Sequence, residues 1–489
     1  MLFNSIDFAF FLPIVFFIYW FVFKDNLKYQ NFLIVMSSYI FYGWWDWRFL
    51  SLILFSTIID FLVGKKLSYE NKIIKRKLLL ILSVSVNLGF LGFFKYYNFF
   101  IDNFIDAFSF FGSEIKPNTL NIILPVGISF YTFQTLSYTI DVYRKKLKAS
   151  PDFISFSAFV CFFPQLVAGP IERAKNLLPQ FNKPKLFNYD QAVNGMRQIL
   201  WGFFKKIVIA DNCAMYANEI FNNSLEYGSV DLIFGAFFFT FQIYGDFSGY
   251  SDIAIGTAKL FGINLKQNFA TPYFSRDIAE FWRRWHISLS TWFRDYLYIP
   301  LGGSRGGTFY KIRNTFAIFL VSGLWHGANW TFVFWGALNA IYFLPLLLSG
   351  HNRKNLGHIS DNKMLPTLKD FLSITSTFLL TVFAWIFFRA NNIGHAFSYI
   401  KGIFSQSIFD DMLFVSTSRE YVELVILLFL IFTLLSVEWF TRGYNHPLEI
   451  FDKYKKNKIF RYITYLIFLF IILIFGAYLN NEQFIYFQF

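Results

Sequence analysis

A single imidazole, that of His326, lies within the otherwise apolar stretch of residues 319–336. Ser322, Asn329 and Thr331 in this stretch can form hydrogen bonds, but they do not titrate near neutral pH. An unperturbed histidine has a pKa of about 6.5 and can take up or release a proton there. Because an ionisable group at membrane depth costs free energy, His326 is a candidate functional residue. The alternative is a histidine that packs against a neighbouring helix and is hydrogen-bonded to it.

Three arginines lie in the most polar stretch of the chain, residues 277–300. At helical spacing, Arg283, Arg284 and Arg294 lie toward one face, and another face is apolar. The apolar face consists of Phe281, Trp285, Leu289, Trp292 and Phe293. This pattern predicts a helix along the cytoplasmic interface, with Trp and Arg at the level of the lipid headgroups. The alternative is that the guanidinium groups bind the phosphates of a nucleotide-type donor.

Three further stretches, residues 124–134, 165–173 and 241–252, combine Pro or Gly breaks with polar side chains. Broken, polar backbone at membrane depth occurs only where it is buried in protein or lines a water-filled cavity. Together these stretches predict one polar cavity. Its candidate lining residues are Gln134, Asp246, Ser248, Trp325 and Asn329. The alternative is that the three stretches are interfacial loops.

The composition excludes a soluble protein and indicates a polytopic membrane protein. Of the 489 residues 55% are hydrophobic and 23% are aromatic, whereas only 15% are charged. The net charge of +13 does not indicate nucleic acid, because Lys and Arg lie in short loops between apolar segments, as the positive-inside rule expects. Cys161 and Cys213 have no metal-ligand spacing, and we infer neither a disulfide nor a metal site.

Hydropathy predicts an all-α protein with roughly 11 to 13 membrane segments, some of them re-entrant, since a span needs about 20 apolar residues. The predicted segments are 6–23, 31–45, 48–64, 78–94, 119–138, 154–168, 192–210, 230–250, 314–324, 328–349, 371–388, 420–440 and 460–479. We predict one integral-membrane domain over residues 1–489, with a retained first span and no separate soluble domain.

The basic loops predict the orientation of these segments. Residues 65–77, 144–148 and 175–185 are rich in Lys and Arg and should be cytoplasmic. Only the segment 154–168 separates the second loop from the third, so it must be re-entrant. The stretch before the last predicted segment, residues 453–461, is also basic, so the tail, residues 480–489, should lie on the outer side of the membrane.

Several motifs resemble the signature region of the membrane-bound O-acyltransferase family. They are Phe281-Trp-Arg-Arg-Trp-His286, Tyr298-Ile-Pro-Leu-Gly-Gly303 and Leu324-Trp-His-Gly-Ala-Asn-Trp330. Residues 124–130, 164–170, 246–252 and 385–390 resemble its alginate O-acetylation branch, which includes peptidoglycan O-acetylation subunits. The resemblance covers nearly the whole chain, with Gly245 as a small departure where a bulkier residue is expected.

The resemblance implies a core with a central cavity in residues 119–340 and a catalytic role for His326. It also matches His286 to a second motif histidine, whose role is catalytic or structural. The implied donor is acetyl-CoA, which would enter from the cytoplasm near the arginines, with no tightly bound cofactor and no metal. The implied location is the bacterial inner membrane, where an extracytoplasmic acetyltransferase-like or esterase-like partner protein would complete the O-acetylation of a polysaccharide.

The six C-terminal residues, 484–489, are apolar and aromatic and include Tyr486. Their Phe-x-Tyr-x-x-Phe pattern resembles the terminal motif of the small companion protein of the teichoic-acid D-alanylation system, whose tyrosine is proposed to receive the acyl group. A phenol of pKa about 10 is a poor nucleophile until a neutral imidazole takes its proton. We therefore pair Tyr486 with His326 as acceptor and base. The alternative is an aromatic belt at the membrane interface.

Two other classes of function stay open on the sequence. A transporter or flippase of a lipid-linked sugar or acyl donor would also contain broken spans and intramembrane polar residues. That class predicts paired repeats, which the sequence lacks. The second class is a scaffold for a modification complex, in which His326 has a purely structural role.

Overall fold

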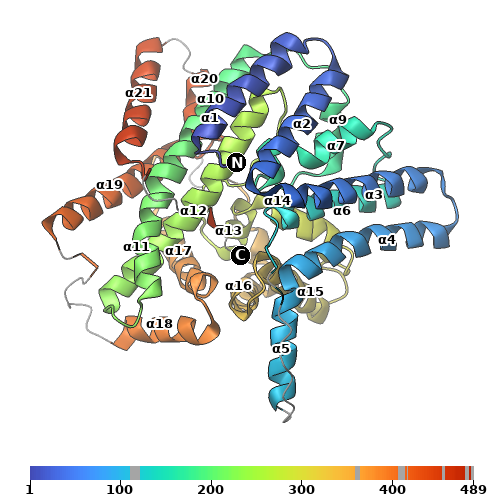
Figure 1. Cartoon of the computed structure of the whole chain (residues 1–489). Coiled ribbons are helices and arrows are strands. Elements are labelled where there is room, and N and C mark those ends of the chain that lie inside the picture. The colour runs from blue at the N-terminus through green and yellow to red at the C-terminus, as the bar shows by residue number, and fades with distance from the viewer. Residues whose placement is uncertain are drawn as a thin grey trace. The chain divides into compact units, whose positions relative to one another are not determined.

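A computed structural model describes residues 1–110, 120, 122–357, 364–405, 414–415, 417–453, 457–478 and 484–485. The described part of the chain is helical and contains no strand. It forms two compact units, the first comprising Met1–Gly195 with Thr257–Lys266 and the second Met196–Gly256 with Gln267–Phe489. Figure 1 shows the helices along the chain.

The first unit contains the N-terminal helices. They are α1 (Ile6–Phe17), α2 (Leu27–Asp46), α3 (Leu50–Tyr69), α4 (Ile73–Leu91), α5 (Tyr97–Phe110), α6 (Ile128–Tyr143), α7 (Phe153–Cys161), α8 (Phe163–Leu166) and α9 (Ala174–Phe181). The π-helical turns η1 (Ile18–Val22) and η3 (Gly92–Tyr96) extend α1 and join α4 to α5. A short 3₁₀ turn, η2 (Trp47–Phe49), precedes α3.

The second unit contains the helices that matter for the candidate site. They are α11 (Asp211–Asn222), α13 (Ile278–Arg284), α14 (Ile287–Phe293), α15 (Thr308–His326), α16 (Trp330–Leu348), α17 (Leu368–Arg389), α18 (Ile393–Ser405), α19 (Ser418–Phe440), α20 (Ile450–Lys453) and α21 (Lys458–Phe475). Helices α10 (Tyr189–Phe203) and α12 (Ser229–Leu260) have residues in both units. The shorter turns are η4 (Phe204–Ala210), η5 (Pro272–Phe274), η6 (Arg294–Tyr298), η7 (His351–Arg353) and η8 (Pro447–Glu449).

Seven helical segments of the described chain are long and apolar enough to cross a membrane. They are Leu27–Tyr69, Ile73–Ser109, Ser229–Leu260, Trp330–Leu348, Leu368–Arg389, Ser418–Phe440 and Lys458–Phe475, the first of which contains both α2 and α3. On α21, Leu466, Phe470 and Leu473 expose 64 to 71% of their surface, as expected for side chains that face lipid. The chain is therefore an all-α, multi-pass membrane protein, as predicted.

Helices α3, α4 and α6 lie side by side in the first unit (Figure 1). The buried carboxylate of Asp60 on α3 accepts hydrogen bonds from Ser83 Oγ and Asn87 Nδ2 on α4, at 2.5 and 2.9 Å, and from Thr139 Oγ1 on α6 at 3.2 Å. A buried carboxylate is tolerated only when such bonds replace water. Asp60 therefore fixes the mutual register of the three helices.

Segment 154–168 forms two short helices, α7 and α8, separated at Phe162. The nine residues of α7 span only about 14 Å, less than half of a hydrocarbon core of about 30 Å. Its residues Ala158 to Cys161 are fully buried. Such a segment cannot cross the bilayer alone, which is what the predicted re-entrant arrangement requires.

The α15–α16 hairpin places His326 at a helix end. A Cβ atom on Gly323 would lie 2.2 Å from the carbonyl oxygen of Phe332, and one on Gly336 would lie 2.3 Å from that of Phe319. These glycines allow the two backbones to approach closely, as small residues do in membrane helix pairs. Helix α15 ends at His326, and Asn329 Oδ1 caps α16 by accepting a hydrogen bond from the amide of Thr331 at 3.0 Å.

Candidate active site

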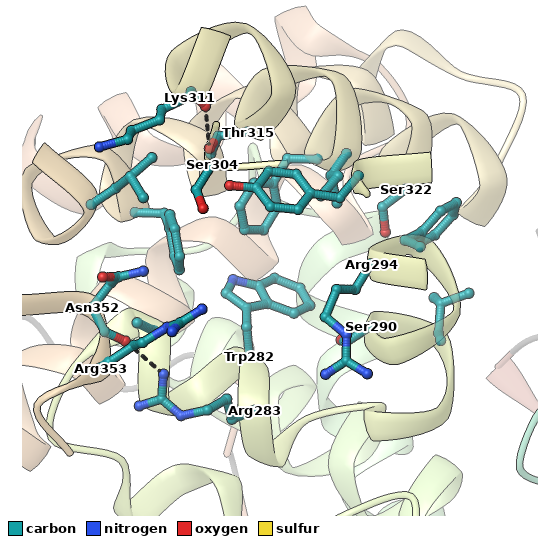
Figure 2. A pocket seen from close by; sticks show the side chains of 18 of the residues that line it. Trp282, Arg283, Ser290, Arg294, Ser304, Lys311, Thr315, Ser322, Asn352 and Arg353 are labelled. Atoms are coloured by element: carbon teal, nitrogen blue, oxygen red, sulfur yellow. Dashed lines mark hydrogen bonds between the residues drawn. The ribbon is translucent and has the colours of Figure 1, made fainter. Parts of the chain in front are cut away.

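A cavity of about 710 Å³ lies in the second unit, between α13, α14, α15, α16 and the segment after α16. Both motif histidines, His286 and His326, line it. Its polar and charged lining residues also include Arg283, Ser290, Arg294, Ser304, Lys311, Thr315, Ser322, Asn352 and Arg353 (Figure 2). The structure therefore brings together two histidines that are 40 residues apart in sequence.

His326 is almost completely buried, with 3% of its surface exposed. Its imidazole lies among three aromatic rings, those of Trp325, Trp335 and Phe388, whose centroids are 5.0, 5.2 and 5.3 Å away. All three contacts are edge-to-face. Three such contacts around one buried ring restrict the position and orientation of the imidazole.

His286 is held differently, in the left-handed region of backbone conformation with φ 43° and ψ 55°. Its Nδ1 is 3.1 Å from Asn268 Oδ1, which also accepts from the amide and hydroxyl of Ser288 at 3.2 and 2.8 Å. The Ser288 amide can only donate, which fixes the orientation of the Asn268 amide, and Asn268 Nδ2 in turn donates to Ser251 Oγ at 3.2 Å. Nδ1 of His286 therefore carries the proton and Nε2 is the acceptor nitrogen.

Burial lowers the pKa of His286 to about 3. Its ring is thus neutral across the physiological pH range. A left-handed conformation is costly for a residue other than Gly, and such residues concentrate at functional sites. His286 is consequently a fixed, neutral imidazole on the wall of the cavity.

The prediction of one continuous amphipathic helix over residues 277–300 is wrong, because the helix is interrupted. Helix α13 ends at Arg284, Trp285 is extended, and α14 begins at Ile287. The break is stable because its backbone forms hydrogen bonds with residues 268–270. The amide of Ile287 donates to the carbonyl of Asn268 at 2.9 Å, and the amide of Ala270 donates to the carbonyl of Arg284 at 3.0 Å. The predicted apolar face, Phe281, Trp285, Leu289, Trp292 and Phe293, is buried inside the protein.

The predicted donor-binding arginines occupy different positions. Arg283 and Arg294 line the cavity, whereas Arg284 is not among its described lining residues. The guanidinium of Arg284 pairs with Glu280 at 2.8 Å and donates to the carbonyl of Ala270 at 3.2 Å. That of Arg283 donates to the carbonyls of Asn352 and Asn355, each at 2.8 Å, which anchors the segment after α16.

Two further cations, Lys311 and Arg353, line the cavity and were missed from the sequence. In Figure 2, Arg283 and Arg353 are drawn on one side of Trp282, and Arg294 is drawn on the other. The described lining residues include no Asp or Glu. Arg294 pairs with Asp295 at 2.8 Å, but the four cations of the lining still outnumber the carboxylates beside it. This excess suits the cavity to an anionic ligand, because charge-assisted bonds to phosphate are among the stronger polar contacts.

The predicted cavity-lining residues lie outside this cavity. Gln134 belongs to the first unit, where its Nε2 donates to the carbonyl of Phe159. Asn329 caps α16 and donates from Nδ2 to the carbonyl of Asn391 at 2.8 Å. Ser248 is buried on α12. Trp325 packs against both histidines, with centroids 5.9 Å from His286 and 5.0 Å from His326, and so links the two rings.

Asp246, also on α12, contacts the described part of the C-terminal tail. The amide of Ile485 donates to Asp246 Oδ2 at 2.7 Å, and Asp246 Oδ1 pairs with Lys206 Nζ at 2.7 Å. The ring of Phe484 is 4.8 Å from that of Tyr250. Phe484 and Ile485 expose only 2% and 1% of their surfaces. This part of the tail is therefore packed inside the second unit.

The tail also lies near the histidines through a shared aromatic neighbour. The Phe247 ring is 6.3 Å from Phe484 and 4.7 Å from the imidazole of His286, the latter in an edge-to-face contact. Tyr486, the next residue after Ile485, lies outside the described residues.

Comparisons with known proteins agree on one family. Residues 142–357 match the membrane-bound O-acyltransferase family, MBOAT. The probable alginate O-acetylase AlgI of Pseudomonas aeruginosa is 39% identical over 92% of this chain and 83% of its own length. That of Azotobacter vinelandii is 38% identical over 94% of this chain and 88% of its own length. The peptidoglycan O-acetyltransferase of Helicobacter pylori is 36% identical, over 82% of this chain and 80% of its own length.

Proposed function

Because the chain belongs to the membrane-bound O-acyltransferase family, and is thus an O-acyltransferase, we propose that it transfers acetyl groups for O-acetylation of a cell-surface polysaccharide. The relatives named as alginate and peptidoglycan O-acetylating proteins support this class of acceptor. The same relatives favour an enzyme over the transporter or flippase that the sequence left open. The location that fits this role is the inner membrane of a bacterium.

The cavity with two histidines and four cations is the observation that carries this proposal. Acetyl-CoA, the proposed donor, carries phosphates that Arg283, Arg294, Lys311 and Arg353 can bind. The apolar lining, which includes Leu289, Phe293 and Phe319, excludes water from the thioester. In this arrangement the acyl carbon lies toward the histidines.

His326 is the proposed base and Tyr486 the proposed acceptor. His326 takes the phenolic proton of Tyr486, and the phenolate oxygen attacks the thioester carbonyl. A C–O bond forms, the C–S bond breaks, and the imidazolium returns the proton to the departing thiolate. The products are acetyl-Tyr486 and free CoA. Packing of Phe484 and Ile485 inside the second unit supports a tail that serves as a tethered acceptor rather than one that lies at the membrane surface.

An extracytoplasmic acetyltransferase-like or esterase-like partner completes the proposed sequence. An aryl ester has a good leaving group, so a serine hydroxyl of the partner can attack the acetyl carbonyl and release the Tyr486 phenol. The partner then acetylates the polysaccharide. The neutral ring of His286 presents Nε2 as an acceptor and keeps a second imidazole on the cavity wall.

Incubation of the purified full chain with acetyl-CoA labelled in the acetyl group tests this function. We expect release of free CoA and incorporation of label into the protein, with arginine variants raising KM. A matched donor without the 3′-phosphate and diphosphate, such as an acetyl thioester of pantetheine, should react with a much higher KM. Movement of intact donor across a vesicle membrane without CoA release would contradict the acyltransferase and support transport.

A further inference from the structure

A second cleft, of about 830 Å³, lies in the first unit, where α3 ends, α4 begins and the loop after α6 meets them. Its described lining residues are Lys65, Leu67, Ser68, Tyr69, Glu70, Asn71, Arg76, Val142 and the segment Lys145–Pro151. Five of these side chains are basic: Lys65, Arg76, Lys145, Lys146 and Lys148. Glu70 is the single carboxylate among them. The cleft is therefore strongly electropositive.

The floor of this cleft is fixed by the buried side chain of Arg76. Its guanidinium donates to the carbonyls of Leu67, Glu70 and Tyr143, the last two at 3.0 and 2.7 Å. These bonds join the α3–α4 connection to the end of α6. Arg76 is thus occupied by the protein itself, and it holds the walls in place before any ligand arrives.

The opposite wall carries three lysines on a tight turn. Lys145 adopts a left-handed conformation with φ 58°, and the amide of Lys146 donates to the carbonyl of Asp141 at 2.8 Å. Lys145, Lys146 and Lys148 are all exposed. Their ammonium groups are therefore accessible to an anion at the mouth of the cleft.

A groove of about 550 Å³ adjoins the cleft and shares Tyr69 and Glu70 with it. It is lined by Lys66, Tyr69, Glu70, Lys75, Leu78, Leu79 and Leu82. The leucines continue along α4, within the predicted membrane span Ile73–Ser109. Leu78 and Leu82 expose 60% and 47% of their surfaces, as lipid-facing side chains do.

Cleft and groove together present positive charge at a helix end and apolar surface along the adjoining span. An acidic protein partner would match the lysines but not the leucines, and a soluble anion would likewise leave the groove unused. A phospholipid matches both, because a phosphate headgroup is joined to an acyl chain. The excess of cations over one carboxylate selects an anionic headgroup over a zwitterionic one.

We propose that this basic cleft and its apolar groove form a binding site for an anionic phospholipid. The headgroup phosphate lies among Lys65, Lys145, Lys146 and Lys148, and one acyl chain lies against Leu78 and Leu82. The bound lipid bridges the α3–α4 connection and the loop after α6. The site belongs to the first unit, whereas the candidate active site belongs to the second.

Native mass spectrometry of the full chain in mild detergent tests this proposal with short-chain phosphatidylglycerol and phosphatidylcholine as probes. We expect the phosphatidylglycerol to bind at least tenfold more tightly. The triple variant Lys145→Gln, Lys146→Gln, Lys148→Gln should lose that preference. A control triple variant, Lys24→Gln, Lys28→Gln, Lys175→Gln, removes the same charge from exposed lysines outside both cavities and should keep it.

Glycerol phosphate and a groove variant separate a lipid site from a simple phosphate site. Leu82→Asn should weaken phosphatidylglycerol binding and leave glycerol phosphate binding unchanged. Equal affinity for glycerol phosphate and the lipid would overturn the proposal in favour of a soluble anion. Equal binding of the two lipids, or equal effects of the two triple variants, would also overturn it.

Discussion

The two histidines of the cavity are positioned by opposite means. His326 ends a regular helix and lies among aromatic rings, whereas His286 interrupts a helix and is fixed through Nδ1 by Asn268. Both rings are buried among aromatic side chains, but Nδ1 of His286 is engaged by Asn268, and burial lowers the pKa of His286 to about 3. A ring that stays neutral is poorly suited to take up a proton during the reaction, so the proposed base is His326 and not His286.

Replacing each histidine in turn tests the two assigned roles with the largest expected effect. We expect His326→Ala to lower acetyl transfer by about 10³-fold, in the range typical of a lost general base. His286→Ala should lower it by a smaller factor, because that ring positions groups instead of moving the proton. The measurement is the rate of acetyl transfer by each purified variant, after size exclusion and thermal melting have shown that the variant is folded. A larger loss for His286→Ala would reverse the two roles.

Asp246→Asn tests whether the tail must be docked near the histidines. The neutral amide accepts a weaker bond from the Ile485 amide than the carboxylate does, so we expect faster hydrogen exchange of the C-terminal peptide and about tenfold slower transfer. The matched control is Asp252→Asn, which removes a charge from the same helix at a carboxylate paired with Lys205. If both variants behave alike, Asp246 acts through the stability of α12 and not through the tail.

Asn268→Asp tests whether the reaction requires a neutral His286. A carboxylate 3.1 Å from Nδ1 would raise the pKa of this histidine toward or above its ordinary value of about 6.5. We expect the acidic limb of the kcat/KM profile to move to higher pH, with about tenfold loss at pH 6 and recovery at pH 8. Asn268→Ala should instead lose activity at every pH. If wild type and Asn268→Asp give the same pH profile of kcat/KM, His286 does not position groups for the reaction.

Gly323→Ala tests the close approach that places His326. The new Cβ would meet the carbonyl oxygen of Phe332 at 2.2 Å and force α15 and α16 apart. Overpacking of this kind costs about 1–3 kcal/mol, which a shift of the melting temperature in detergent measures. Gly89→Ala on α4, where a Cβ meets nothing within 4 Å, is the control and should melt like the wild type or slightly higher. Equal melting of both variants would contradict the account of the hairpin.

The smallest expected effect is a pH dependence of stability from His286. Its pKa in the folded protein, about 3, lies below the unfolded value of about 6.5, so the unfolded chain binds more protons between these values. The contribution of this group is therefore complete above pH 6.5 and declines as the pH falls. Between pH 7 and 5 we expect a loss of about 2 kcal/mol, which His286→Gln should reduce. An unchanged slope in that variant would argue against a buried neutral ring.

Hydropathy and helical periodicity were sufficient for the all-α class, because they depend on the local sequence. They failed at Trp285 and His286, where the break depends on backbone bonds to residues 268–270, far from the helix pattern. Lys311 and Arg353 were missed for a related reason. They join Arg283 only after the α15–α16 hairpin forms, and no local motif marks them.

The tail shows a different limit of sequence reasoning. Apolar composition alone cannot distinguish an aromatic belt from a segment packed inside the protein. The contacts of Phe484 with Tyr250 and of Ile485 with Asp246 make that distinction for two residues. The predicted role of Tyr486 is untouched by them and stays a prediction.

Mass spectrometry of the C-terminal peptide, after exposure of the purified chain to acetyl-CoA, tests whether His326 and Tyr486 act as base and acceptor. In the wild type we predict that the mass of the peptide increases at Tyr486 by about 42 Da, the increase expected when one acetyl group forms an ester with an activated hydroxyl. The increase should be absent from Tyr486→Phe and from His326→Ala, both of which should remain folded in the membrane. CoA release with an unmodified Tyr486, or acetylation of Tyr486 that persists in His326→Ala, would contradict the proposed pair.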